Sequence, residues 1–437
     1  MELRSTFMGH LKQVKKEYRE LQKRLHKNPV GAPESEHLYD ILKILYSEEE
    51  ARTAAMIPMV PATLGKISRR TGMNAAKLEK LLDGMANKGL VMDFRHEKLG
   101  KTFYMLAPPV VGFFEFSMMR ERSDIPQKEL AEAMYRYMYD TGDFSKEVFG
   151  YDTMLGRAMV HETAVSDEDL SEVLEWERAT AIIEDAKKHS VSLCYCRHKA
   201  RHVGHECGMP EEICLSMGQG ADWLIGRNFA REISKNEALD LLGKGRELGL
   251  VHVADNVQQD PSFICNCCGC CCGMLGAINK HNMPNAVHTT GFLAAINLDE
   301  CKGCGKCAKR CPIDAISIEE MKKEDGKKKK WAEVDESICL GCGVCEMACK
   351  FDSLYMKKRS GRKIITPKTA LERMLTMAIE RGRLQNFLFD EMSEGPTSEF
   401  FKNLADVVLD MPAARRLLLN REVKSRFLDF ISRKAGM

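Results

Sequence analysis

The pattern of apolar positions near the start of the chain predicts an amphipathic helix. Apolar residues recur there at alternating steps of four and three, which is the spacing of a heptad seam. The seam consists of Phe7, Leu11, Val14, Tyr18, Leu21 and Leu25, with lysines and arginines beside it. Two partners for this seam stay open, because it could pack on the next domain of its own chain or pair in a homodimer. We assign residues 1–36 to this N-terminal heptad helix.

Residues 37–107 show the element order of a winged-helix domain, and they resemble such domains. The pattern predicts a helix with Leu38, Ile41, Leu42 and Leu45 on its apolar face, a short helix that starts near Pro61, and a third helix that is capped by Asn74 and ends at Gly89. Residues 90–94 and 102–106 are predicted to pair as a hairpin.

This winged helix has two interpretations, DNA contact or protein docking. Lys77, Lys80 and Arg95 are the candidates for DNA contact. Glu79 and Asp83 lie among those lysines and weaken the attraction of this helix to phosphate. We therefore expect no specific DNA binding, since a fold does not fix a function.

The pattern elsewhere predicts mostly helix. Residues 108–190 are predicted to be a helical linker region with helices at 127–139 and 169–189. The segments expected after it are a helical cysteine-rich domain at 191–290 with a strand at 191–193 and a long helix at 219–248, a ferredoxin-type domain at 291–358, and a helical C-terminal region at 359–437. The predicted fold class is thus α+β, mostly helical.

Cysteine content is the unusual feature of the composition, with 18 cysteines in 437 residues. The formal charge of +2 gives no general attraction to nucleic acid. The first ten residues contain no apolar signal core, and no apolar stretch is long enough to span a membrane. We therefore expect a cytoplasmic protein whose thiols stay reduced for metal binding, and the number of sites suggests anaerobic metabolism.

Two cysteine runs of the same form carry the clearest chemistry. Both have three cysteines spaced by two residues and a fourth after three more, namely Cys301, Cys304, Cys307 and Cys311, then Cys339, Cys342, Cys345 and Cys349. Three such thiolates on one tight loop can reach one cluster, while the fourth points away to another cluster. Glycines at 303, 305, 341 and 343 would allow the unusual loop dihedrals.

These motifs make residues 293–357 similar to a bacterial two-cluster [4Fe-4S] ferredoxin. The resemblance implies two crossed ligand sets, with Cys301, Cys304, Cys307 and Cys349 on one cluster and Cys339, Cys342, Cys345 and Cys311 on the other. Lys350 follows Cys349 where the family usually has proline, as in Pro312. Strands at 316–318 and 331–334 are expected to form a hairpin that turns at Asp325-Gly326.

Ten further cysteines precede this segment, namely Cys194, Cys196, Cys207, Cys214, Cys265, Cys267, Cys268, Cys270, Cys271 and Cys272. Such a density of soft thiolates favours iron–sulfur or copper(I), and zinc stays an alternative. We expect one or two further iron–sulfur clusters with ligands from both the 194–214 and 265–272 groups, although spacing does not show which cysteines belong together. The basic residues from Arg197 to His205 could stabilise a reduced cluster, bind an anion, or form a solvated loop.

The arrangement resembles multi-cluster ferredoxin-like proteins of strict anaerobes, in which Cys-x-Cys-Arg and Cys-Asn-Cys-Cys-x-Cys-Cys segments precede two cubane motifs. Our leading hypothesis is an electron-transfer protein, or a subunit of an oxidoreductase complex, that exchanges low-potential electrons with a partner oxidoreductase or carrier protein. One alternative is a redox-sensing winged-helix transcription regulator. The other is a reductase that binds substrate at the upstream cysteine-rich centre, so whether the chain is itself an enzyme stays open.

Overall fold

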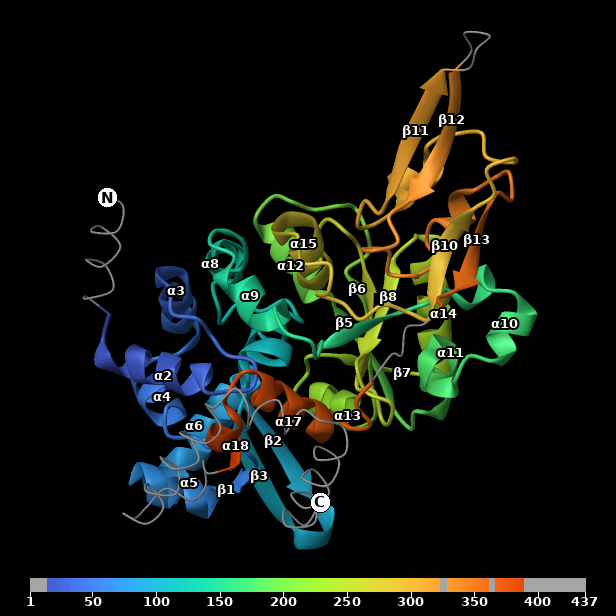
Figure 1. The fold of residues 1–437 in the computed structure, drawn as a ribbon. Helices are drawn as coiled ribbons and strands as arrows, with labels where there is room; N and C mark the ends of the chain where they lie inside the picture. The colour runs from blue at the N-terminus through green and yellow to red at the C-terminus, as the bar shows by residue number, and fades with distance from the viewer. Residues whose placement is uncertain (1–13, 323–327, 361–365, 389–437) are drawn as a thin grey trace, which may run out of the picture. The chain divides into compact units, whose positions relative to one another are not determined.

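The computed structural model describes residues 14–322, 328–360 and 366–388. It divides into two compact units, of which the first comprises Met1–Thr153 with Leu371–Met437 and the second comprises Met154–Ala370. Both units contain helices and strands, which confirms the α+β class (Figure 1). Phe7, Leu11, the predicted turn at Asp325-Gly326 and the C-terminal helices predicted after residue 388 lie outside the described residues.

The first unit combines helices with a small antiparallel sheet of order β1-β3-β2. Its elements are α2 (Lys16–His26), α3 (Glu36–Leu45), α4 (Glu48–Ala54), β1 (Ala62–Thr63), α5 (Leu64–Thr71), α6 (Ala75–Asn87), β2 (Val91–His96), η1 (Glu97–Leu99), β3 (Lys101–Leu106), η2 (Pro109–Phe113), α7 (Phe114–Phe116), α8 (Gln127–Tyr139), α9 (Asp143–Phe149), α17 (Ala370–Glu380) and α18 (Leu384–Leu388).

Several local predictions for this unit are confirmed. The Asn74 side chain accepts hydrogen bonds from the Ala76 and Lys77 amides, so it caps α6 as expected. The apolar face predicted for α3 is buried. Strands β2 and β3 pair with Val91 opposite Leu106, which is the predicted hairpin. The helix predicted at 127–139 is α8.

The described part of the N-terminal seam is buried within its own unit. Tyr18, Leu21 and Leu25 on α2 are all buried. The Tyr18 hydroxyl donates a 2.9 Å hydrogen bond to the carbonyl of Tyr46, beyond the end of α3. This part of the seam therefore packs on its own chain, which was one of the two alternatives.

The second unit is built on a six-stranded antiparallel sheet of order β4-β8-β9-β6-β5-β7. Its elements up to residue 281 are β4 (Gly156–Met159), η3 (Glu162–Ala164), α10 (Asp167–Ser171), η4 (Glu175–Glu177), α11 (Ala179–Asp185), β5 (His189–Leu193), α12 (Tyr195–His202), β6 (Glu212–Met217), α13 (Gly218–Gly226), β7 (Arg231–Ile233), α14 (Lys235–Glu247), β8 (Val251–Asp255), β9 (Phe263–Cys267) and α15 (Gly273–His281). Figure 1 shows α12 and α15 on one side of this sheet and α11 and α14 on the other.

The prediction of a helical middle domain is wrong, because the sheet organises it. The strand expected at 191–193 exists, but β4 shows that the sheet begins before the predicted boundary at 191. The helix expected at 219–248 is interrupted by β7, and the one expected at 169–189 is broken, with Leu174 half exposed instead of in the core. Short apolar runs do not distinguish buried strands from helix, and this ambiguity explains the error.

The rest of the second unit consists of two hairpin-like pairs around the two regular cysteine runs. Its elements are β10 (Phe292–Ile296), α16 (Lys306–Arg310), β11 (Ile316–Lys322), β12 (Lys328–Val334), η5 (Glu346–Ala348) and β13 (Leu354–Lys358). Strand β10 pairs with β13, and β11 pairs with β12 with Ile316 opposite Val334, as predicted. Among the described residues, no helix has the length and apolar character needed to cross a membrane.

Candidate metal centres

Each regular cysteine run lies on a loop that needs glycine. Gly303 and Gly305 have φ of 59° and 74°, and Gly341 and Gly343 have φ of 72° and 81°. A Cβ atom on Gly341 would lie 2.1 Å from the Phe292 carbonyl oxygen, so a larger residue does not fit there. The predicted unusual dihedrals of these four glycines are therefore confirmed.

The turns that follow the two runs also have the same backbone form. Asp314 lies three residues after Cys311 with φ of 54°, and Asp352 lies three residues after Cys349 with φ of 51°. Lys350 replaces the usual proline in the second turn without removing this matching left-handed residue. The two halves are thus local repeats in structure as well as in sequence.

We call Cys311, Cys339, Cys342 and Cys345 the inner group. These four residues line one small cavity, together with apolar neighbours such as Ile313. Burial raises the pKa of the Cys342 thiol to about 12 and also raises the pKa of Cys345 and Cys311. The Ala315 amide donates a 3.2 Å hydrogen bond to Cys311 Sγ. The set of cysteines around this cavity is the set that the ferredoxin resemblance assigns to one cluster.

We call Cys301, Cys304, Cys307 and Cys349 the outer group. Cys304 is exposed, and the other three are partly buried. The Ala332 amide donates to Cys301 Sγ at 3.4 Å, and burial, together with the nearby Cys301 and Cys304 thiols, raises the pKa of Cys307. Cys349 Sγ lies 3.3 Å from the Ser353 hydroxyl, and its assignment to the same cluster as the other three stays a prediction.

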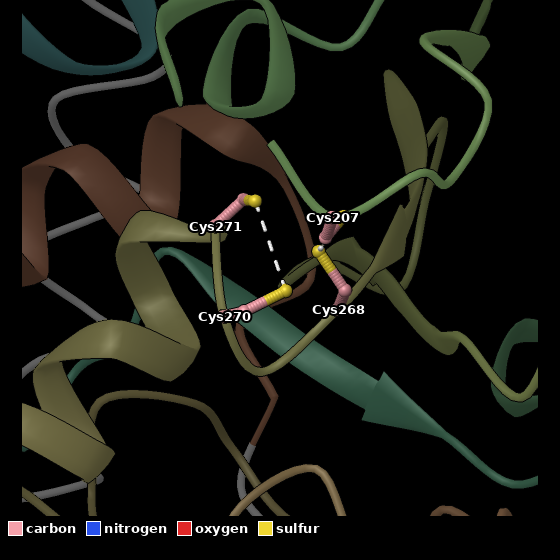
Figure 2. Close-up of side chains that lie close together, drawn as sticks. All are labelled: Cys207, Cys268, Cys270 and Cys271. Carbon is pink, nitrogen blue, oxygen red and sulfur yellow. Dashed lines mark hydrogen bonds between the residues drawn. The ribbon is translucent and has the colours of Figure 1, made fainter. Parts of the chain in front are cut away.

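Four upstream cysteines form a second candidate site, which we call the four-thiol group. The sulfur atoms of Cys207, Cys268, Cys270 and Cys271 all lie within 4.8 Å of one another (Figure 2). Cys207 follows α12, whereas the other three lie in the loop between β9 and α15, so the site draws on both upstream sequence groups. The interaction with Cys271 and the charge of Arg197 outweigh burial and lower the pKa of Cys268 to about 4.

The remaining six upstream cysteines form a closed set of neighbours, which we call the six-thiol ring. Each thiol affects the pKa of the two beside it, in the order Cys194, Cys196, Cys272, Cys267, Cys265, Cys214 and back to Cys194. Four of the six are buried, and Cys214 and Cys265 are partly buried. The ten upstream cysteines are therefore divided into four and six.

The pleat of strand β9 explains this division. Side chains alternate between the two faces of a strand, so Cys265 and Cys267 point to the same face and Asn266 points to the other. The neighbouring strand β6 supplies Cys214, since its Leu215 pairs with Ile264. Cys268 follows the strand and belongs instead to an apolar cluster with Ile213 and Leu250.

Two basic residues of α12 lie between the two upstream sites. Arg197 and Lys199 are 3% and 1% exposed, which excludes the solvated-loop interpretation for them. Burial acts to lower the pKa of Arg197, but the charges of Cys194, Cys268 and Cys214 raise it well above its usual value. Burial lowers the pKa of Lys199, against the opposing effect of Cys196, Cys272 and Cys271. Both cations therefore face sulfur atoms of both groups.

The four-thiol group also packs closely on the inner group. A Cβ atom on Gly269, which lies between Cys268 and Cys270, would be 2.0 Å from the Pro312 carbonyl oxygen. The Asn279 side chain donates to the carbonyl oxygens of both Gly269 and Pro312, at 3.1 and 3.0 Å. Because Pro312 follows Cys311, the two candidate centres are separated by directly contacting backbone.

A buried polar network supports the sheet at this point and was not foreseen from the sequence. His252 Nδ1 lies 2.7 Å from Asn266 Oδ1, and Asn266 Nδ2 donates to the Ile213 carbonyl at 2.8 Å. Burial lowers the pKa of His252 to about 3, so the ring is neutral and donates from Nδ1. The alternating order Cys265-Asn266-Cys267 was the available indication of a strand that carries thiols on one face and a polar anchor on the other.

Comparison with known proteins supports the ferredoxin-like segment. Residues 300–353 match the family model described as a 4Fe-4S dicluster domain. No curated protein and no solved structure matches the chain. The chain thus contains an iron–sulfur ferredoxin-like segment, and its cysteine-rich groups are consistent with iron–sulfur clusters.

Proposed function

We propose that this protein carries low-potential electrons between a partner oxidoreductase and iron–sulfur centres inside its second unit. The dicluster match at residues 300–353 supports two [4Fe-4S] clusters at the inner and outer groups. The four-thiol group would hold a third cluster, because its sulfur atoms are four in number and mutually close. These clusters would supply one-electron redox chemistry.

The observation that carries this proposal is the packing between the inner group and the four-thiol group. The Gly269 backbone contacts Pro312, which follows an inner-group cysteine, so the backbone beside the two sets of sulfur ligands is in direct contact. The outer group is more exposed than the inner one, because Cys304 is exposed whereas Cys339, Cys342 and Cys345 are buried. Electrons would therefore enter or leave the protein at the outer group and would move between it and the four-thiol group through the inner group.

The chain's own residues would tune these centres. Backbone amides donate to Cys301 and Cys311, and such hydrogen bonds to sulfur stabilise the reduced, more negative state of a cluster. Arg197 acts in the same direction at the four-thiol group. In the first unit, α3, α5 and α6 followed by the β2–β3 hairpin support a winged-helix module that serves assembly with a partner.

Anaerobic reductive titration followed by electron paramagnetic resonance tests this function. The full chain should accept electrons reversibly at several centres, and reoxidation by a viologen dye should return all of them. The substitution Cys345→Ser in the inner group should slow reoxidation of the four-thiol centre, because it removes the cluster through which electrons pass from that centre to the outer group. Centres that show no reversible reduction down to about −700 mV, the lower limit for such clusters, would exclude electron transfer.

A further inference from the structure

The six-thiol ring is a set of ligands that the proposed electron path does not use. Its thiols come from the N-cap positions of α12 and α15, the second residue of α12, and the strands β6 and β9. The six cysteines are spread over the sequence from Cys194 to Cys272. Four separate elements are thus required to bring these sulfur atoms together, which is typical of a built site.

The surroundings of the ring place positive charge beside the sulfur atoms. The first peptide amides of α12 and α15 lie beside Cys194 and Cys272, and helix N-termini carry partial positive charge. The Gly273 amide donates a 3.5 Å hydrogen bond to Cys196 Sγ. Arg197 and Lys199 are buried on the same helix as Cys196. Burying two cations is costly unless anions compensate them, so neutral thiols alone do not account for this environment.

The number of thiols restricts what can occupy the ring. A single structural zinc ion is tetrahedral and takes four thiolates, so it would leave two of the six without a role. Two zinc ions that share two bridging thiolates would use all six, and the zinc content of the protein separates that case from iron. A single [4Fe-4S] cluster also takes four. Three disulfides would use all six sulfur atoms, but they would be neutral and would leave both cations uncompensated.

Six terminal thiolates fit a pair of joined four-iron cores. Each iron of such a core takes one ligand from outside it. When two cores share one bridging sulfide, the bridge satisfies one iron of each core, and six irons then need cysteine. The closed ring supplies that number, with each thiol beside two others.

We propose that the six-thiol ring binds a polynuclear iron–sulfur centre that consists of two joined four-iron cores and uses all six cysteines. This centre is distinct from the four-thiol group, and Arg197 lies between the two. The inference does not depend on the proposed electron transfer, because it concerns which atoms bind iron.

The first test is the metal content of the anaerobically purified full chain. With the ferredoxin-like segment and the four-thiol group loaded as cubanes, the joined centre brings the total to about twenty irons per chain, with sulfide in similar amount and no zinc. A total of about twelve irons, or of about sixteen, overturns the proposal, because the ring then holds no iron or a single cubane. Stoichiometric zinc also overturns it.

The second test compares variants of the full chain. Cys214→Ala with Cys267→Ala removes two ring positions that are not neighbours and should cost about eight irons. The matched control Ser216→Ala lies two residues from Cys214 on the same strand and should keep all the iron. A loss of about four irons, or none, contradicts the joined centre. Mössbauer spectra should retain the ferredoxin-type clusters in the variant. If these are lost too, the wild-type metal content decides the question alone.

Discussion

The eight cysteines of the ferredoxin-like segment lie between positions 301 and 349 in two runs of equal spacing, whereas the ten upstream cysteines lie between 194 and 272 without a repeated spacing. In the first region each run lies on a single loop with two left-handed glycines, and the thiols of Cys339, Cys342 and Cys345 line one cavity. In the second region strands β6 and β9 and helices α12 and α15 must first assemble. Local sites can therefore be identified from spacing, and sites built by tertiary structure cannot.

The largest expected effects come from the crossed ligands of the ferredoxin-like segment. Cys345→Ser should remove the inner cluster. Cys349→Ser should remove the outer cluster, and with it the electron paramagnetic resonance signal of the cluster that Cys301 binds. Each substitution should cost about four irons per chain, because one thiolate of four is lost. Metal analysis and electron paramagnetic resonance of both variants check this.

The comparison of the two variants decides whether the ligands are crossed. If Cys349→Ser and Cys345→Ser remove the same cluster, the fourth cysteine of each run serves its own loop and the family pattern does not apply here. Ser353→Ala is a matched control, since it alters the 3.3 Å contact of Cys349 Sγ and leaves every thiol in place.

This contrast shows how much the sequence could predict. The inner set around Cys311, the four left-handed glycines, the hairpin of β11 with β12 and the Asn74 cap all depend on neighbours within a short stretch. The six-stranded sheet was missed because its strands are short, and their apolar runs can be interpreted as helix. The four-thiol group brings Cys207 beside Cys268, Cys270 and Cys271, so cysteines of both upstream groups do meet, and their binding of a cluster stays a prediction.

The division of ten upstream cysteines into four and six needed the strand register. Cys267 and Cys268 are adjacent in sequence but belong to different groups of thiols, because β9 ends at Cys267 and the chain then turns away. Arg197 and Lys199 were recognised as basic, but their burial depends on how α12 packs on the sheet. No spacing rule contains this information.

A second prediction applies the comparison to the four-thiol group. Cys207→Ala should remove about four irons and leave both ferredoxin-type signals, because Cys207 is the one ligand from the loop after α12. Iron analysis with resonance spectra measures this. Its neighbour Glu206→Ala serves as the control and should keep all the iron. An unchanged iron content in Cys207→Ala would reassign this group to zinc or to thiol chemistry.

A smaller effect should follow from changing the contact between the two regions. Gly269→Ala places a Cβ atom 2.0 Å from the Pro312 carbonyl oxygen, so the loop or the Cys311 turn must shift. We expect a loss of about 1–3 kcal/mol in unfolding free energy, which is typical of overpacking, and slower electron exchange between the inner and four-thiol centres. Anaerobic thermal unfolding measures the change in stability, and freeze-quench electron paramagnetic resonance measures the rate of electron exchange.

Gly243→Ala is the control for that substitution. Gly243 lies in α14, and an added Cβ atom there would have no neighbour within 4 Å outside its own helix backbone, so alanine should stabilise the helix by about 0.5–1 kcal/mol. Equal stability and equal exchange rates in the two variants would mean that the Gly269–Pro312 contact does not couple the two regions.

The smallest effect is expected at α6, where the sequence pattern predicts a winged helix but does not decide between DNA contact and protein docking. Lys77 forms an ion pair of 2.5 Å with Glu49, and both side chains are largely exposed. Such pairs contribute at most about 1 kcal/mol, and Glu49 reduces the charge that Lys77 can offer to phosphate. Lys77→Ala with Lys80→Ala should therefore leave duplex DNA binding, measured by fluorescence anisotropy at physiological salt, weak and unchanged. Tight, sequence-dependent binding that these substitutions abolish would instead favour the redox-sensing regulator, and would show that the acidic neighbours of α6 do not prevent DNA contact.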